Sequence, residues 1–372
     1  MLKRVALLVI SIALLFSPIK ANALGLSAES WALCDESGKI IASHGDRRMA
    51  MASTTKIMTA LVVIENNDMD TVVSVPHEAV GVEGSSVYLK EGQRITVEQL
   101  LYALLLQSAN DAAETLAIHT AGDIAAFADM MNSRANDIGL ADTHFTNPHG
   151  LSDDDHYTTA SELAKITAEA MKNDTFRKIV STYKYTFPVI DADEKQSASH
   201  TVVNHNKLLK SYSGCIGVKT GFTKASGRCL VSAAERGGTT LIAVTLNAPN
   251  DWNDHRQLLD YGFSLCKSVD LYLLCPQLYL DVVGGKTRQV RAVPSENIRV
   301  TVPRDAEIDY IIECRRFLYA PIKEGDIVGQ IIYTSNGERI ASSDLCVTES
   351  CDKTEEKITF FDWLFGLFGI SK

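Results

Sequence analysis

A serine hydroxyl and a lysine amine lie three residues apart at Ser53 and Lys56, directly before the apolar run of residues 61–64. Serine and threonine before such a run are typical of a helix start, because their side chains bond to free backbone N–H groups. A helix that begins near Ser53 brings Ser53 and Lys56 to one face, at the positive end of the helix dipole. This arrangement suits a serine nucleophile with a lysine base.

The Ser-x-x-Lys pattern alone does not identify a catalytic site, because it occurs five times in this chain. The alternative interpretation of each copy is a helix cap followed by a surface lysine. The functional interpretation therefore depends on other segments.

Two later segments carry polar groups that could complete such a site. Ser108-Ala109-Asn110 interrupts a helical run that begins with the capping-box pair Thr96 and Gln99. Serine, asparagine and aspartate disfavour helix interiors, so we expect a polar loop at residues 108–111 between two buried helices. Lys219-Thr220-Gly221 is expected on a strand beside an antiparallel hairpin formed by residues 229–234 and 240–247.

The remaining predicted elements divide the chain into an N-terminal part with both helices and strands and a C-terminal part that is rich in strands. Residues 30–34 and 40–44 indicate a hairpin, residues 121–140 and 158–172 indicate helices, and residues 254–263 a closing helix. Residues 270–346 carry short β-rich pieces broken by Gly-Gly, Pro and Asn-Gly, which predicts a small all-β domain.

Length and charge limit the class of protein. The chain has 372 residues, so it can form more than one domain. Its formal net charge of −10 argues against a nucleic-acid partner.

A secretory signal peptide is predicted over residues 1–23 by a basic start, an apolar core from Val5 to Phe16 and the segment Ala21-Asn22-Ala23. An uncleaved anchor is the alternative. We expect an exported protein at the outer face of the cytoplasmic membrane.

The eight cysteines are scattered and include no Cys-x-x-Cys pair. An exported chain could form disulfides from them, but buried free thiols are the interpretation we favour. The spacing also argues against zinc. The loop carboxylates Asp153, Asp154 and Asp155 lack calcium-loop spacing, so we expect no metal and no cofactor.

The C-terminal segment, residues 358–370, is rich in phenylalanine and leucine and too short to span a bilayer. Phe361, Leu364, Phe365 and Phe368 fall on one helical face. This predicts an amphipathic helix that lies in the membrane surface; a tail packed onto the protein body is the alternative.

Together, Ser53-Thr54-Thr55-Lys56, Ser108-Ala109-Asn110 and Lys219-Thr220-Gly221 resemble the motifs of the penicillin-recognising serine enzymes. The chain most resembles low-molecular-mass penicillin-binding proteins that act as serine-type D-Ala-D-Ala carboxypeptidases. The resemblance extends to residues 51–60, 147–151, 219–228 and 258–263.

The resemblance implies an α+β fold of the β-lactamase/transpeptidase-like type, with an antiparallel sheet, a helical subdomain and a small all-β C-terminal domain. The implied division is a signal peptide (1–23), a catalytic domain (24–267), a β-rich domain (268–347) and a tail with the anchor helix (348–372). The implied partners are peptidoglycan stem peptides, β-lactam antibiotics and the membrane surface.

The resemblance also implies roles at the site. Ser53 attacks the carbonyl of the penultimate D-Ala, and Lys56 accepts its proton, provided that burial and Lys219 lower the pKa of the amine. Ser108 relays a proton to the leaving amine, and Asn110 fixes Lys56 or the substrate backbone.

The strand residues are implied to bind the substrate. Lys219 and Thr220 hold the terminal carboxylate, while Gly221 and Phe222 pair with the extended peptide through their backbone. The backbone N–H groups of Ser53 and Phe222 form the oxyanion hole.

Two departures from the family pattern stand out. Phe222 follows Lys-Thr-Gly where some members carry histidine or another polar residue, and Asp251 stands where some carry a carboxylate-binding arginine; Arg256 lies on a different helical face. A β-lactamase and a DD-endopeptidase or transpeptidase are the enzymatic alternatives. A non-catalytic cell-wall-binding scaffold is the alternative from another class.

Overall fold

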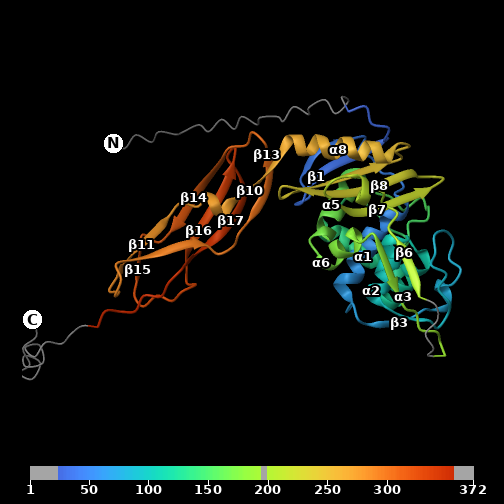
Figure 1. Ribbon diagram of the computed structural model, residues 1–372, viewed down its shortest axis with the longest axis horizontal. Helices are drawn as coiled ribbons and strands as arrows, with labels where there is room; N and C mark the ends of the chain where they lie inside the picture. Colours follow the sequence, from blue (N-terminus) through green and yellow to red (C-terminus); the bar gives the residue numbers. More distant parts are fainter. Residues whose placement is uncertain (1–23, 194–198, 356–372) are drawn as a thin grey trace, which may run out of the picture. The chain divides into compact units, whose positions relative to one another are not determined.

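The computed structural model describes residues 24–193 and 199–355, which form two compact units (Figure 1). One unit contains the described residues up to Arg236 together with Thr240–Ser264. The other contains Gly237–Thr239 and the described residues from Leu265 onward. The predicted signal peptide (1–23) and the predicted anchor helix (358–370) lie outside the described residues. Within the described ranges, every helix is too short or too polar to cross a membrane.

The first unit is built on a five-stranded sheet with the strand order β2-β1-β9-β8-β7. Strands β1 and β2 form the first predicted hairpin, and β8 and β9, which are neighbours in the sheet, occupy the segments predicted for the second. The pairs β1–β9 and β7–β8 are also antiparallel. β7 is an edge strand, so its outer backbone groups are not used by the sheet. The strands are β1 (Ser30–Asp35), β2 (Ile40–His44), β7 (Cys215–Thr223), β8 (Gly227–Arg236) and β9 (Thr239–Leu246).

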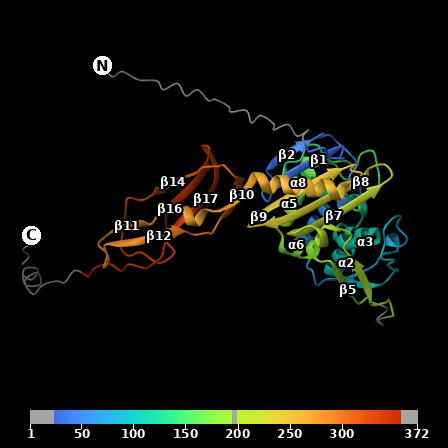
Figure 2. The same cartoon turned by 45° about the horizontal axis from the view of Figure 1, so that its top comes forward.

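Alternate residues of β8 pack on opposite faces of this sheet. Cys229 and Val231 belong to the core shared with the helical layer, whereas Leu230 packs with Leu258 and Leu259 of α8 (Asp251–Leu265). Figure 2 shows α8 lying along the sheet. The alternation is the period of two expected of a strand covered on both faces.

The helical layer surrounds α1 (Lys56–Asn66), in which the first eight residues are all buried. α2 (Val97–Leu106) begins with the predicted capping box, since Thr96 Oγ1 accepts from the Gln99 N–H while the Gln99 side chain accepts from the Thr96 N–H. The other helices are α3 (Asn110–Ala121), α4 (Ile124–Ile138), α5 (Ala160–Met171), α6 (Asp174–Ser181) and α7 (Leu208–Ser211). Two short hairpins, β3 (Val72–Ser74) with β4 (Arg94–Thr96) and β5 (Lys184–Phe187) with β6 (His200–Val203), complete the unit.

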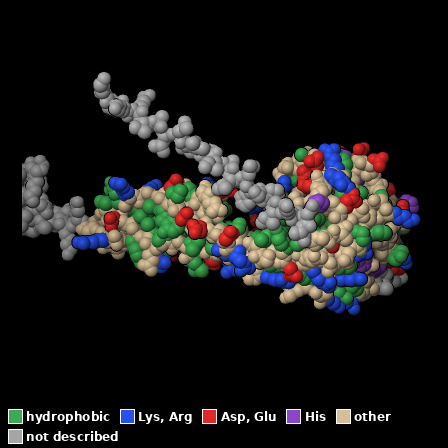
Figure 3. Space-filling model, turned by 90° about the horizontal axis from the view of Figure 1, so that it is seen from above, with side chains coloured by type: hydrophobic (Ala, Val, Ile, Leu, Met, Phe, Trp, Pro, Cys, Tyr) green, Lys and Arg blue, Asp and Glu red, His purple; other side chains and the backbone are tan. Residues whose placement is uncertain are grey.

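The second unit contains a six-stranded sheet in the order β14-β16-β17-β12-β11-β15. Ile331, Tyr333 and Leu345 lie in its small apolar core. Figure 3 shows the charged and apolar side chains on one face of the protein. The strands of the second unit are β11 (Leu278–Val283), β12 (Gln289–Pro294), β14 (Ile308–Cys314), β15 (Phe317–Tyr319), β16 (Ile327–Ser335) and β17 (Glu338–Val347), and β10 (Cys266–Asp270) pairs with β13 (Arg299–Pro303). All eight cysteines of the chain are free thiols.

Candidate active site

Ser53 lies in a 3₁₀ turn, η2 (Ala52–Thr55), immediately before α1. The α-helix itself begins at Lys56, three residues later than the sequence suggested, and Ser53 does not act as a cap. Ala52 has a left-handed φ of 48°, and Thr54 Oγ1 donates to the Met51 carbonyl at 2.6 Å, so this turn is held by other groups. The Ser53 hydroxyl is left available to Lys56.

The amine of Lys56 is fully buried and contacts three oxygens. Nζ lies 2.7 Å from Asn110 Oδ1, 2.7 Å from the His149 carbonyl and 3.1 Å from Ser53 Oγ. Burial lowers the pKa of Lys56 well below its ordinary value, and the nearby charge of Lys219 lowers it further.

A neutral amine has two hydrogens and one lone pair. The Asn110 amide oxygen and the His149 carbonyl can only accept, so they take the two hydrogens of Lys56. The lone pair is then left for Ser53 Oγ at 3.1 Å, and in this state the serine hydroxyl donates to Lys56. This is the geometry of a general base beside its nucleophile.

Asn110 is the first residue of α3 rather than part of the preceding loop, which is a difference from the sequence expectation. Its Nδ2 donates to the Glu83 carbonyl, which fixes the amide so that Oδ1 faces Lys56. Ser108 is buried in the turn between α2 and α3 and has a left-handed φ of 63°. The structure places Ser108 two residues from Asn110, although Lys56 contacts Asn110 and not Ser108 in the described part of the chain.

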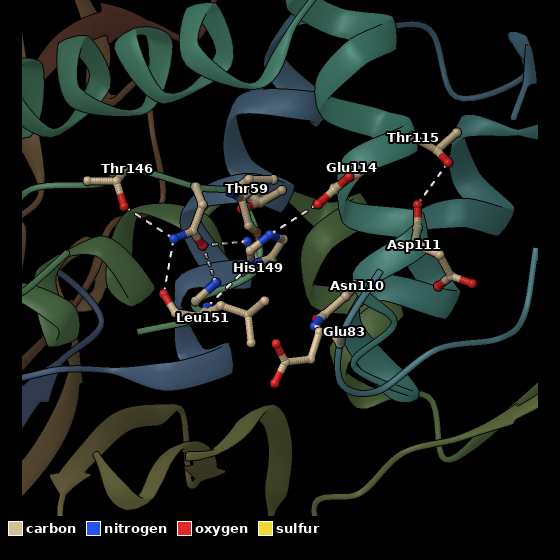
Figure 4. A network of polar contacts seen from close by, with 12 residues as sticks. Thr59, Glu83, Asn110, Asp111, Glu114, Thr115, Thr146, His149 and Leu151 are labelled. Carbon is tan, nitrogen blue, oxygen red and sulfur yellow. Dashed lines mark hydrogen bonds and ion pairs between the residues drawn. The ribbon is translucent and has the colours of Figure 1, made fainter. Parts of the chain in front are cut away.

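The loop of residues 147–151 supplies the second acceptor to Lys56. Figure 4 shows His149 and Leu151 of this loop, with a dashed line from His149 to Glu114. Asn147 Oδ1 accepts from the Gly150 N–H at 2.7 Å, and its Nδ2 donates to the Leu151 carbonyl at 3.0 Å. The Leu151 N–H donates to His149 Nδ1, so the proton of the neutral ring is on Nε2, 3.3 Å from Glu114. This stretch resembles the family pattern, but its residue types do not indicate the contact between the His149 carbonyl and Lys56.

Gly150 allows this loop to lie directly on η2. It has φ +86°, and a Cβ at this position would fall 2.0 Å from the Ala52 carbonyl oxygen. Buried His156 adds a second attachment, since its Nδ1 accepts from the Thr146 N–H and its Nε2 lies 2.7 Å from Thr55 Oγ1. Burial lowers the pKa of His156 to about 4, so the ring is neutral at pH 7.

The edge strand β7 approaches Ser53 at Gly221. A Cβ added to Gly221 would lie 3.1 Å from the Ser53 backbone nitrogen and 3.1 Å from the Met51 carbonyl oxygen. Lys219 is buried, its Nζ donates to the Thr220 carbonyl at 2.8 Å, and burial lowers its pKa to about 7. The fold therefore brings the predicted Lys-Thr-Gly segment beside the predicted nucleophile.

Asp251, which stands where some family members carry a carboxylate-binding arginine, forms an ion pair. Asp251 is buried at the start of α8, and Arg228 of β8 donates to both of its carboxylate oxygens at 3.0 and 2.9 Å. Arg256 donates to Ser211 Oγ instead. Phe222, opposite Arg228 in the sheet register, is 64% exposed.

The described residues contain no group of three or more His, Cys, Asp and Glu side chains that could hold a metal ion. A buried lysine whose pKa is lowered, beside a serine, a polar inter-helix turn and an edge strand, is the arrangement of the penicillin-recognising class of serine enzymes.

Within that class, the chain belongs to the D-alanyl-D-alanine carboxypeptidase family, whose family model matches residues 18–250. A second family model, described as the C-terminal domain of penicillin-binding protein 5, matches residues 277–353.

Similar proteins agree with this assignment. The chain is 30% identical to the D-alanyl-D-alanine carboxypeptidase DacF of Bacillus subtilis over 362 residues, which cover 92% of each chain. It is 31% identical to DacC of Escherichia coli, over 89% of this chain and 86% of DacC. Among solved structures, penicillin binding protein 5 from Haemophilus influenzae has a TM-score of 0.65 at 27% identity and covers 88% of this chain and 98% of its own. The Streptomyces K15 DD-transpeptidase has a TM-score of 0.62 at 36% identity, covering 64% and 98%.

Proposed function

We propose that this protein is a serine-type D-Ala-D-Ala carboxypeptidase that removes the terminal D-Ala from peptidoglycan stem pentapeptides and is acylated by penicillin. The observation that carries this proposal is the Lys56 amine, which is fully buried and lies 3.1 Å from Ser53 Oγ. An uncharged lysine can take the serine proton, whereas a lysine in water is protonated and cannot.

In the proposed reaction, Ser53 Oγ attacks the carbonyl of the penultimate D-Ala and passes its proton to Lys56. The tetrahedral intermediate collapses to an acyl-enzyme as the terminal D-Ala leaves. Ser108 relays the proton to the leaving amine, and Asn110 holds Lys56 in place. Water then hydrolyses the ester, and Ser53 is regenerated.

The proposed substrate contacts lie on β7. Lys219 and Thr220 bind the terminal carboxylate, and the outer edge of the strand pairs with the extended peptide. The backbone N–H groups of Ser53 and Phe222 form the oxyanion hole, where losing one donor typically costs about 10²–10³ in rate. The close approach of Gly221 to the Ser53 nitrogen supports this arrangement.

The protein acts outside the cytoplasm in this proposal. We infer that residues 1–23 are removed on export, that residues 24–267 form the catalytic domain and residues 268–347 the β-rich domain. The tail, residues 348–372, would hold the enzyme at the outer face of the cytoplasmic membrane through an amphipathic helix. Its partners are the stem peptide, β-lactams and the membrane surface.

Each alternative function predicts a different reaction outcome. A β-lactamase hydrolyses the penicilloyl ester quickly, whereas the proposed carboxypeptidase keeps it. An endopeptidase cleaves cross-linked peptides, a transpeptidase transfers the acyl group to an added amine, and a scaffold protein releases no D-Ala.

The test is D-Ala release from a stem pentapeptide, with fluorescent penicillin labelling of the same samples. The wild type should release D-Ala and be labelled, and Ser53→Ala should do neither. Ser181→Ala is a matched control, because Ser181 is an exposed serine in another Ser-x-x-Lys copy and its hydroxyl donates to the Lys178 carbonyl. D-Ala release by Ser53→Ala would overturn the assignment of the nucleophile.

A further inference from the structure

Two large apolar side chains stand out as the most exposed in the first unit: Tyr88, at 83%, and Phe222, at 64%. Phe222 directly follows Gly221, whose backbone approaches Ser53. Tyr88 lies in a different segment, far from β7 in the sequence.

The segment that carries Tyr88 is attached to the residue that holds Lys56. The Asn110 N–H donates to the Ser85 carbonyl at 2.7 Å, and Asn110 Nδ2 donates to the Glu83 carbonyl. The same Asn110 accepts from Lys56 Nζ. Figure 4 shows Glu83 beside Asn110 at the start of α3. Glu83 and Ser85 therefore lie beside the residue that holds Lys56, and Tyr88 follows three residues after Ser85.

Asp111, which is buried, fixes the conformation around Tyr88. Its carboxylate accepts from Ser86 Oγ at 2.6 Å, from the Val87 N–H at 3.3 Å and from the Leu89 N–H at 2.9 Å. Val87 and Leu89 are buried on either side of the exposed ring. The backbone of Tyr88 is thus held in place by both of its neighbours.

Tyr88 itself has a left-handed φ of 60°. This conformation is unfavourable for a residue with a large side chain, and glycine or asparagine usually occupies it. Such conformations persist where the surrounding structure imposes them, and they cluster at functional sites. Here the imposed conformation turns the tyrosine ring outward, where its apolar surface has no cover in the described part of the chain.

We propose that the ring of Tyr88 is a specificity determinant that packs against the aliphatic side chain of the peptide residue preceding D-Ala-D-Ala. This inference rests on the proposed function. The two D-alanine residues present only methyl groups, so the preceding residue is the first that can offer a long apolar chain to the ring. An exposed aromatic ring held in one orientation contributes contact area at low entropic cost.

The test compares two pentapeptides that are identical except for L-lysine or L-alanine at the third position. We expect the wild type to prefer the lysine peptide in kcat/KM by about tenfold, the size of effect that roughly two buried methylenes produce. Tyr88→Ala should lose this preference, and Tyr88→Phe should keep it. The rate of acylation by benzylpenicillin, which lacks that side chain, should change less than about twofold in both variants.

Two further measurements keep the test decisive. Tyr88→Gly suits the left-handed backbone, so it should fold at least as well as the wild type and should also lose the preference. Tyr279→Ala, at an exposed tyrosine of the second unit, should retain it. An unchanged preference in Tyr88→Ala and Tyr88→Gly, with D-Ala released by the wild type, overturns the role of Tyr88 alone. Release of no D-Ala by the wild type refutes the proposed function and this inference with it.

Discussion

Replacing Asn110 by aspartate should disable Lys56 by charge, although it also removes the Nδ2 donor to the Glu83 carbonyl. Asn110 Oδ1 lies 2.7 Å from Lys56 Nζ, and aspartate places a carboxylate oxygen at nearly the same point. At an effective dielectric constant of about 20, the attraction between a carboxylate and an ammonium at this distance is about 6 kcal/mol. If burying the new carboxylate cancels half of that energy, about 3 kcal/mol still favours the charged amine, so the neutral amine becomes up to about 100-fold scarcer at pH values below the raised pKa of Lys56.

The assay is the second-order rate of acylation by a fluorescent penicillin, measured from pH 6 to pH 10. Between pH 6 and pH 7, Asn110→Asp should react more slowly than the wild type, by up to about 100-fold. Its rate should recover toward pH 10, because the aspartate raises the pKa of Lys56 and deprotonation moves to higher pH. Asn110→Ala is the control, since it removes the hydrogen bonds of Asn110 to Lys56 and to the Glu83 carbonyl and adds no charge; it should be slower without this recovery. A rate for Asn110→Asp equal to the wild-type rate at pH 7 would refute the neutral-lysine reasoning.

Three further predictions concern Gly221, Lys219 and His156. Gly221→Ala places a Cβ 3.1 Å from the Ser53 nitrogen, so β7 must shift, and acylation should fall by about 10²; a wild-type rate would contradict the proposed oxyanion geometry. Lys219 has a pKa of about 7 in the folded protein and about 10.5 when unfolded, so the unfolded chain binds more protons between these values and the wild type gains stability as pH rises. Lys219→Met should therefore raise the free energy of unfolding at pH 7 by roughly 2–4 kcal/mol, with a smaller gain at pH 10, as urea unfolding at both pH values will show. Burial lowers the pKa of His156 to about 4, so the unfolded state takes up more protons between pH 6.5 and 4 and stability falls as the pH drops through this window. His156→Gln should flatten that fall in a Tm series, and an unchanged slope would assign the acid sensitivity to other groups.

Features fixed by neighbouring residues could be predicted from the sequence. The capping box of Thr96 and Gln99 is present, because both partners lie within one helical turn. The β-rich pieces also appear where apolar residues and turn residues indicated them; strand β11 (Leu278–Val283), for example, lies within the predicted β-rich stretch of residues 270–346. The family, the α+β fold class and the serine peptidase activity expected from the motifs agree with the comparisons.

Contacts between distant segments could not be predicted in this way. The hydrogen bond from Lys56 to the His149 carbonyl joins residues 93 positions apart, and a backbone carbonyl leaves no signature in residue type. The start of α1 was placed too early, because the left-handed Ala52 turn and the loop at Gly150 shape η2 through tertiary packing. The sequence shows that position 251 is an aspartate and not an arginine, but only the fold shows that Asp251 forms an ion pair with Arg228.

The catalytic roles of Ser53, Lys56 and the Lys-Thr-Gly strand depend on one covalent bond. Intact-mass analysis after incubation with benzylpenicillin tests it most directly, followed by peptide mapping. The wild type should gain the mass of one benzylpenicillin molecule on the peptide that contains Ser53, and Ser53→Ala should gain none. An adduct of the same mass on Ser53→Ala, or none on the folded wild type, would contradict the account.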